Sequence, residues 1–227
     1  MIIINSIIKI DEYVSFYYKM LGEFELTEKK KSICEIRKQE ICQAAIVCFL
    51  EKGFHNTTME DVISKTSLSK GGVYYYYKNT REMIFDIFME GNKHRIDLIK
   101  SYVNENNLSL SDLEDEDIMA ELMVDKILTD NPLMKIYAQF LVEANYDKVL
   151  FQTYQKIQEA SKEELLRFFN NENKNKTSNE EFIFISYLLN TFILGVNILN
   201  ARENFLLNKK VIKEMVKSAI IHIKEEV

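Results

Sequence analysis

Glycine and proline are scarce in this chain, whose 227 residues include six glycines and one proline. Most sheet proteins need many tight turns, which these two residue types supply. Their scarcity therefore favours long helices joined by short polar connections. Because 47% of the residues are hydrophobic, the chain can also fill a core, and we predict an all-α fold.

Capping residues and apolar spacing divide the chain into helices. Thr57, followed three residues later by Glu60, predicts a capping box that opens a short helix. Ser69 is the expected cap of the next helix, and Asn79 with Glu82 opens a long one. We expect an amphipathic extension over 1–28 and, in the N-terminal half, helices over about 32–52, 57–66, 69–77 and 79–105. In the C-terminal half we expect a helix ending near 128, another starting at Asn131-Pro132, and helices over 147–169, 179–203 and 208–225. The polar links lie at 107–116 and 170–178.

The inner faces of these helices follow from the same spacing. Four consecutive tyrosines spread around a helix at about 100° per residue, so Val73 and Tyr77 should pack inward while residues 74–76 stay outside. Cys48 falls on the apolar face of its helix. The long helix is expected to bury Ile84, Ile87, Phe88, Gly91, Leu98 and Tyr102, and the last helix Ile212, Met215, Val216, Ala219 and Ile223.

Charge is distributed unevenly along the chain, whose net charge is −6. Residues 29–81 hold ten Lys and Arg against five Asp and Glu, a balance of +5 that leaves −11 for the rest. A basic block attached to an acidic body suits a modular DNA-binding protein, because phosphate contacts are local. Two short helices joined by the tight link 67–68 lie within this block and predict a helix-turn-helix. The alternative is a chance cluster of charges on a solvated helix.

One stretch combines apolar, glycine, threonine and aromatic residues at fixed spacing: Arg37, Ile41, Ala44-Ala45, Phe49, Gly53, Phe54, Thr57-Thr58, Ile63, Ser69-Lys70-Gly71, Val73-Tyr74, Tyr77-Lys78 and Met83. Through these positions, residues 37–83 resemble the signature of the TetR family of regulators. The resemblance implies an N-terminal three-helix helix-turn-helix DNA-binding domain and a C-terminal helical ligand-binding and dimerisation domain. We accordingly place a helical extension at 1–28, the DNA-binding domain at 29–80 and the effector-binding and dimerisation domain at 81–227. Two positions depart from the family pattern, with a neutral Thr80 where lysine is frequent and Thr66-Ser67 in place of Ala-Gly.

The expected DNA contacts have physical reasons beside the resemblance. Thr57 and Thr58 begin a helix whose free N–H groups and hydroxyls can hold a phosphate. Residues 69–72 form the first turn of the recognition helix, whose leading residues reach base edges in the major groove. Its two glycines cost about 1 kcal/mol each in helix propensity, and either close approach to DNA or indifference at an exposed turn accounts for them. The predicted DNA-binding residues are Thr57, Thr58, Ser69, Lys70, Gly71, Gly72, Tyr74, Tyr75, Tyr76, Lys78 and Thr80.

The resemblance further implies a ligand-responsive repressor that binds a palindromic operator as a homodimer. The charge-free stretch 182–199 suits the subunit interface. The aromatic residues of the C-terminal part suit an apolar or aromatic effector, although an aromatic stripe is more often plain core. The alternative function is a TetR-like dimeric adaptor that binds proteins and not DNA. The predicted interface residues are Tyr187, Leu189, Phe192, Val196, Met215 and Ala219, and the predicted effector-binding residues are His94, Tyr137, Phe140, Tyr154 and Tyr187.

Other classes of protein find little support in the sequence. No His-Glu-x-x-His, phosphate loop, Gly-x-Ser-x-Gly or Cys-x-x-Cys motif occurs, so we expect neither an enzyme nor a metal or cofactor site. Cys34, Cys42 and Cys48 lack metal-ligand spacing and suit reduced thiols. The stretch 182–199 reaches the length of a membrane span but contains polar residues and lacks a basic flank. We therefore expect a cytoplasmic protein that does not insert into membranes.

Overall fold

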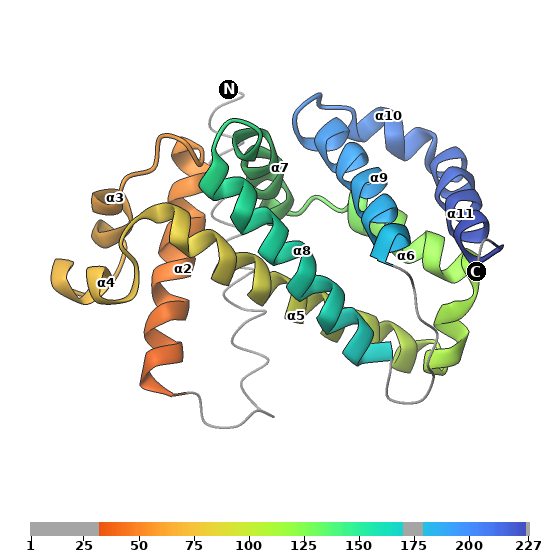
Figure 1. The fold of residues 1–227 in the computed structure, drawn as a ribbon, viewed down its shortest axis with the longest axis horizontal. Coiled ribbons are helices and arrows are strands. Elements are labelled where there is room, and N and C mark those ends of the chain that lie inside the picture. The colour runs from red at the N-terminus through yellow and green to blue at the C-terminus, as the bar shows by residue number, and fades with distance from the viewer. Residues whose placement is uncertain (1–31, 170–178, 226–227) are drawn as a thin grey trace. The chain divides into compact units, whose positions relative to one another are not determined.

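The structure is a computed structural model that describes residues 32–169 and 179–225. These residues form helices and connections without a strand, so the fold is all-α as predicted. The chain divides into two compact units, Met1–Met83 and Ile84–Val227 (Figure 1). The extension over 1–28 and the polar link at 170–178 lie outside the described residues. The domain boundaries proposed from the sequence stay a prediction.

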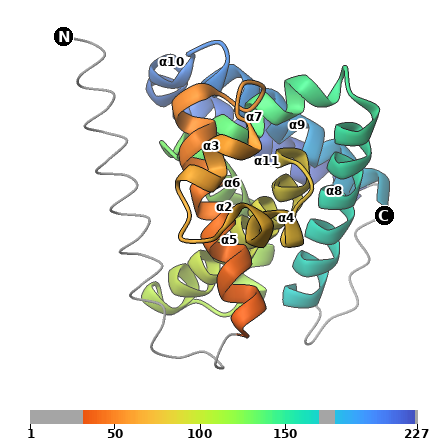
Figure 2. The ribbon, with the colours of Figure 1, turned by 90° about the vertical axis from the view of Figure 1, so that its left-hand side faces the viewer.

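The N-terminal unit is a small bundle of α2 (Ile33–Lys52), α3 (Met59–Ser64) and α4 (Lys70–Tyr76), followed by the first turn of α5 (Thr80–Glu105) (Figures 1 and 2). Ser32 caps α2 in a capping box with Glu35, whose carboxylate accepts the Ser32 N–H at 2.7 Å. Gly53 ends α2 with a φ of 81°, a left-handed value that glycine adopts without steric cost. The core of this unit includes Ile41, Ala45, Cys48, Phe49, Phe54, Val62, Val73, Tyr77 and Met83.

The C-terminal unit contains the rest of α5 and six further α-helices in its described part. Asn131 caps one of them by accepting the Leu133 N–H at 2.9 Å, with proline in the first turn, as the sequence predicted. Among the described helices, none combines the length and the apolar character that a membrane crossing requires. The elements after α5 are the 3-10 helix η2 (Leu110–Glu114) and α6 (Glu116–Leu128), α7 (Pro132–Ala144), α8 (Lys148–Phe169), α9 (Asn179–Asn197), α10 (Arg202–Leu207) and α11 (Lys209–Glu225).

Two helices distant in sequence, α6 and α11, are joined by a ladder of ion pairs beside their apolar contact. Acids spaced four residues apart on α6 face lysines spaced four apart on α11, so each charge meets a partner across the helix pair. The pairs are Lys209–Asp125 at 2.7 Å, Lys213–Glu121 at 2.9 Å and Lys217–Asp117 at 2.6 Å. Below them lies a core of Ala120, Val124, Ile127, Leu128, Ala138, Ile193, Val196, Ile212, Val216 and Ile220.

The predicted apolar faces of α5 and α11 are partly wrong. Leu98 is 55% exposed, whereas Ile96 and Val103 are buried at 7% and 8%. The buried face predicted from the first turns of α5 therefore does not continue to the end of the helix. A helix of 26 residues meets different neighbours along its length, so the side that is buried changes. On α11, Met215 is 53% exposed and Ile220 is buried instead.

The connections also differ from the expected ones. The predicted helix over 179–203 ends at Asn197, and Asn200 with a φ of 55° turns the chain into the separate α10. Phe205 of α10 then lies so close to Gly195 that a Cβ there would stand 3.1 Å from its ring, which explains the glycine. The polar link at 107–116 contains η2, whose Leu113 is buried.

The register of α5 can be tested by a matched pair of substitutions. Ile96→Ala should lower the free energy of unfolding by about 2–4 kcal/mol, because it leaves a cavity in a packed interior. Leu98→Ala should change it by less than about 0.5 kcal/mol, because the side chain is already in water. Urea unfolding followed by circular dichroism measures both. The reverse order of effects would show that the buried face continues through Leu98.

Candidate nucleic-acid interface

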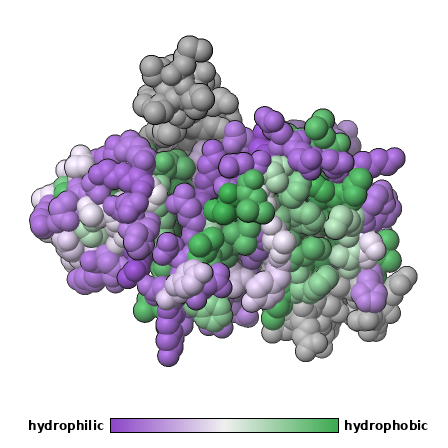
Figure 3. Space-filling model, turned by 90° about the horizontal axis from the view of Figure 1, so that it is seen from above, coloured by the Kyte–Doolittle hydropathy of each residue, from purple (hydrophilic) through white to green (hydrophobic). Residues whose placement is uncertain are grey.

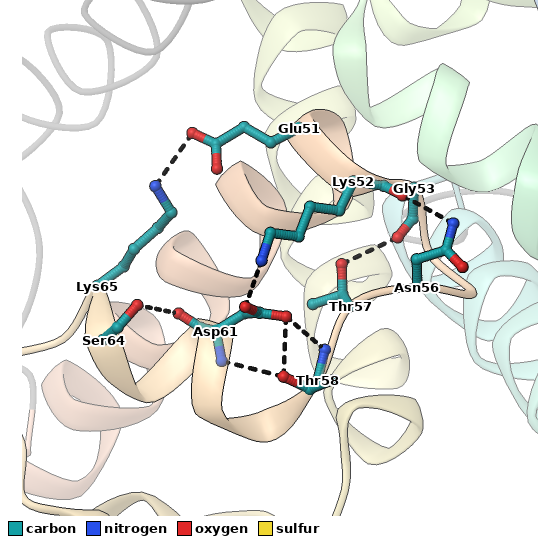
Figure 4. A network of polar contacts seen from close by, with 9 residues as sticks. All are labelled: Glu51, Lys52, Gly53, Asn56, Thr57, Thr58, Asp61, Ser64 and Lys65. Atoms are coloured by element: carbon teal, nitrogen blue, oxygen red, sulfur yellow. Dashed lines mark hydrogen bonds and ion pairs between the residues drawn. The ribbon is translucent and has the colours of Figure 1, made fainter.

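The first helix of the helix-turn-helix, α3, is capped by Thr58 and not by Thr57 as predicted. The Asp61 N–H donates to the Thr58 hydroxyl at 3.2 Å, and the Thr58 N–H donates to the Asp61 carboxylate at 2.9 Å (Figure 4). Thr57 is 6% exposed, and its hydroxyl donates to the Gly53 carbonyl at 2.9 Å. The prediction that Thr57 offers a hydroxyl to phosphate is therefore wrong, because that hydroxyl ties the α2–α3 connection together.

Two ion pairs hold α3 against the end of α2 (Figure 4). The Lys52 ammonium bonds to the Asp61 carboxylate, and the Lys65 ammonium lies 3.0 Å from Glu51. The bond from Lys52, with further bonds from Thr58, lowers the pKa of Asp61 to about 2. Asp61 thus closes the capping box and joins two helices with one carboxylate.

The second helix, α4, is held by its inner side. Val73 is fully buried and Tyr77 is 3% exposed, as predicted. The Tyr77 hydroxyl lies 3.4 Å from the Cys42 sulfur, and the Lys38 ammonium stands 5.6 Å above the Tyr77 ring. Both contacts reach α2, so the end of α4 is fixed to the longest helix of this unit.

The first turn of α4 faces solvent. Ser69 caps the helix by accepting the Gly72 N–H at 3.2 Å, as predicted, and Ser69, Lys70 and Gly71 are exposed. A Cβ at Gly71 would meet no atom within 4 Å, whereas one at Gly72 would lie 3.4 Å from the Ser69 hydroxyl. The packing of the protein itself therefore gives no reason for a glycine at position 71.

Three tyrosines follow this exposed turn along α4. Tyr75 is 78% exposed and packs edge-to-face on Tyr76, with ring centroids 5.0 Å apart. Tyr74 is half-buried, and the Lys70 ammonium stands 5.8 Å from its ring. Of the three rings predicted to face outward, Tyr74 thus lies beside Lys70, and Tyr75 and Tyr76 contact each other.

Lys70 also forms an ion pair with Glu60, which the sequence predicted to be a capping residue. Its ammonium lies 3.0 Å from the Glu60 carboxylate, and this bond raises the pKa of Lys70. Glu60 was interpreted as a capping residue, and no periodicity in the sequence indicates this pair. At the other end of α4, the Lys78 ammonium donates to the Tyr74 carbonyl at 3.3 Å, while Thr80 is half-buried at the start of α5.

Comparison with known proteins bears on this unit. A family model for bacterial regulatory proteins of the tetR family matches residues 41–87, which run from α2 into α5. Over 55 residues the chain is 46% identical to the HTH-type transcriptional regulator YfiR of Bacillus subtilis (strain 168), covering 24% of this chain and 27% of that one. Over 46 residues it is 37% identical to IcaR of Staphylococcus epidermidis, a biofilm operon negative transcriptional regulator, covering 20% and 25% of the two chains.

Residues 41–87 therefore resemble the tetR family of bacterial regulatory proteins. The matched part spans only about a quarter of either relative. A solved structure, Salmonella enterica GusR, resembles the fold over 86% of this chain and 98% of its own, with a TM-score of 0.60 and 16% identity. This likeness extends the all-α architecture beyond the helix-turn-helix.

The residues predicted to bind an effector lie in the C-terminal unit. The Phe88 ring stands 5.0 Å from that of Tyr137 and 5.7 Å from that of Phe140. The Tyr154 hydroxyl accepts bonds from Gln158 and, at 3.1 Å, from Asn190, which sequence reasoning missed. Two further predicted residues are less enclosed. His94 is half-buried, with a pKa lowered by burial, and Tyr187 is 54% exposed, although it interacts electrostatically with Tyr154.

The residues predicted to form the subunit interface separate into outer and inner positions. Tyr187 and Met215 are exposed at 54% and 53%. Val196 is 7% exposed within the core of its own unit, and Leu189 and Phe192 pack against that core. Ala219 is half-buried. The exposed positions Ile183, Phe184, Tyr187 and Thr191 form one outward stripe on α9, and Val211, Met215, Ser218 and His222 form another on α11.

The role of Asp61 can be tested by the pH dependence of stability. Its folded-state pKa of about 2 is depressed, so its stabilising effect is present above the unfolded-state pKa and is lost as the pH falls through the folded value. Asp61→Asn should therefore unfold at lower urea concentration at pH 7, and the difference should shrink from about pH 4 to pH 2. Glu159→Gln, which removes an exposed carboxylate of α8, is the control. A difference between Asp61→Asn and wild type that does not vary with pH would contradict the ion pair.

Proposed function

We propose that this protein is a transcriptional repressor of the cytoplasm that binds a palindromic DNA site as a homodimer and leaves it when a small molecule binds. The resemblance of residues 41–87 to the tetR family model supports DNA binding and regulation. The Staphylococcus epidermidis relative is described as a negative regulator, which favours repression here. The adaptor alternative would leave the exposed first turn of α4 without a purpose.

Gly71 is the observation that carries the proposal. Glycine in a helix lowers stability, and nothing in the described part of the chain approaches a Cβ at this position. A helix tolerates such a cost where another backbone must come close. In the major groove, the first turn of a recognition helix meets base edges and the adjacent phosphates, which gives Gly71 a reason.

The proposed contacts follow from exposure. Ser69, Lys70, Gly71 and Gly72 approach the bases, and the outer tyrosines contact sugar and phosphate. Lys70 would exchange the Glu60 carboxylate for a phosphate, which keeps its charge paired in both states. The remaining proposed contacts are Thr58, Tyr74, Tyr75, Tyr76, Lys78 and Thr80, while Thr57 acts by positioning α3.

The outward stripes of α9 and α11 are the proposed dimer contact. Figure 3 shows hydrophobic side chains gathered on the displayed face of the C-terminal unit. Large exposed apolar patches on a soluble protein mark interaction sites. A two-fold pair of these units presents two copies of α4, which requires half-sites about one helical turn, or ~34 Å, apart. An effector that binds the DNA-incompetent arrangement more tightly would shift the pair away from DNA.

Gly71→Ala separates folding from DNA binding. We expect the free energy of unfolding to rise by about 0.5–1 kcal/mol, because alanine is the better helix former. Affinity for a duplex selected from random DNA by the wild-type chain should fall about tenfold or more, because the methyl group meets the DNA. Fluorescence anisotropy measures the second effect.

Gly91→Ala is the matched control for this experiment. A Cβ there would lie 3.6 Å from Leu133, an ordinary contact, so this variant should keep full DNA affinity. If Gly71→Ala binds DNA as tightly as Gly91→Ala does, the close approach is disproved. If the wild-type chain selects no duplex even at low salt, the result supports the adaptor function instead of DNA binding.

The dimer contact can be tested by a charge on its exposed surface. Met215→Glu should convert the dimer to a monomer, because the glutamate would be buried unpaired against its partner. Leu98→Glu, at a position that is 55% exposed against 53% for Met215, should remain dimeric. Sedimentation velocity distinguishes the two. If Met215→Glu remained dimeric, the interface would have to lie outside the α11 surface around Met215.

A further inference from the structure

The described part of the C-terminal unit holds a buried arginine without adequate partners. Arg95 of α5 is half-buried, and its Nε and Nη2 atoms are buried without a hydrogen bond to any described residue. Arginine keeps its charge under all ordinary conditions and has five N–H donors to satisfy. A buried guanidinium in this state destabilises the protein unless a partner is supplied.

A second cation, Lys126 of α6, shares this region. Burial, together with the charge of Arg95, lowers the pKa of Lys126 to about 7, so the two charges act on each other. No described residue forms an ion pair or hydrogen bond with its ammonium. Two like charges brought together inside a protein favour an anion between them.

One acid faces these cations without neutralising them. Glu164 of α8 acts electrostatically on Arg95, yet the described residues include no ion pair between the two. The Oε2 atom of Glu164 is buried without a partner as well. With Lys126 protonated, Arg95, Lys126 and Glu164 together carry one net positive charge.

Aromatic and amide groups surround the same place. The Tyr137 hydroxyl interacts with Arg95, and the Tyr137 ring packs on Phe88. Burial raises the pKa of Tyr137, which therefore remains a neutral hydrogen-bond donor. Asn190, which donates to Tyr154, joins this side from α9. This group of residues thus combines apolar rings with a small number of polar side chains, the composition that ligand sites have.

We propose that Arg95 and Lys126 bind the anionic group of the effector, an organic acid whose apolar or aromatic body contacts Tyr137, Phe88 and Tyr154. The proposal depends on the proposed ligand-responsive function and names its ligand class. A carboxylate or phosphate matches the planar guanidinium and supplies the acceptors that Arg95 lacks. Binding would also neutralise the excess positive charge.

The first test compares matched acids and amides on the full chain. Thermal unfolding is measured with benzoate and benzamide, with 4-phenylbutyrate and 4-phenylbutanamide, and with octanoate and octanamide, while phenyl phosphate separates phosphate esters from carboxylates. At least one anion should raise Tm by more than its neutral counterpart does, because only the anion satisfies both cations. Equal shifts for every acid and its amide would overturn the proposal.

The second test removes each cation. Arg95→Met and Lys126→Met should weaken binding of the stabilising acid about tenfold or more, whereas Lys135→Met, which alters an exposed lysine of α7, should bind as wild type does. Without ligand, Arg95→Met should melt at the same temperature as wild type or higher, because an unpaired buried charge has been removed. Retained acid binding, or a lower Tm without ligand, would assign Arg95 a structural role instead.

Glu164→Gln keeps the proposal testable if Arg95→Met does not fold. Removing the competing carboxylate should tighten acid binding, whereas a structural Arg95–Glu164 pair predicts lower stability without tighter binding. DNA affinity of the wild-type chain is measured separately. Failure to bind DNA would defeat the proposed repressor, yet acid-selective stabilisation would still establish the anion site.

Discussion

The burial of Val73 and Tyr77 is the contact on which the helix-turn-helix depends. A helix of seven residues does not persist alone in water, because nucleating the first turn costs more than its few hydrogen bonds return. Anchoring its inner side to α2 allows the opposite side to consist of glycines, a lysine and tyrosines, none of which contributes a core. The exposed turn at Gly71 exists because the far end of α4 is fixed.

Charge inside the N-terminal unit serves folding as well as recognition. Residues 29–81, which have a net positive charge, also contain acids that pair with lysines of the same unit. Asp61 pairs with Lys52, and Glu60 pairs with Lys70. Exposed pairs of this kind add little stability and exchange partners readily. Lys70 is therefore paired beside the exposed first turn of α4 and, in the proposed DNA complex, can exchange Glu60 for a phosphate.

The C-terminal unit treats its charges in two ways. On α6 and α11 the acids and lysines meet in register at the surface, where pairing is easily satisfied. Arg95, Lys126 and Glu164 lie deeper and leave atoms without partners among the described residues. Groups kept in this state lower stability, so they are more readily explained by a ligand than by the fold.

Local signals determined much of this protein from its sequence alone. The all-α fold, the caps Ser69 and Asn131, and the inward positions Val73 and Tyr77 all depend on residues within a turn or two of one another. Errors arose where the answer depended on distant parts of the chain. The Thr57 hydroxyl bonds to the Gly53 carbonyl and is not offered to phosphate, and Leu98 is exposed. The predicted single helix over 179–203 is divided into α9 and α10, with Phe205 packed on Gly195. Only the tertiary structure decided that Asn190 meets Tyr154 and that Arg95 and Lys126 share one buried region, because burial of a polar group is set by whichever helices pack around it.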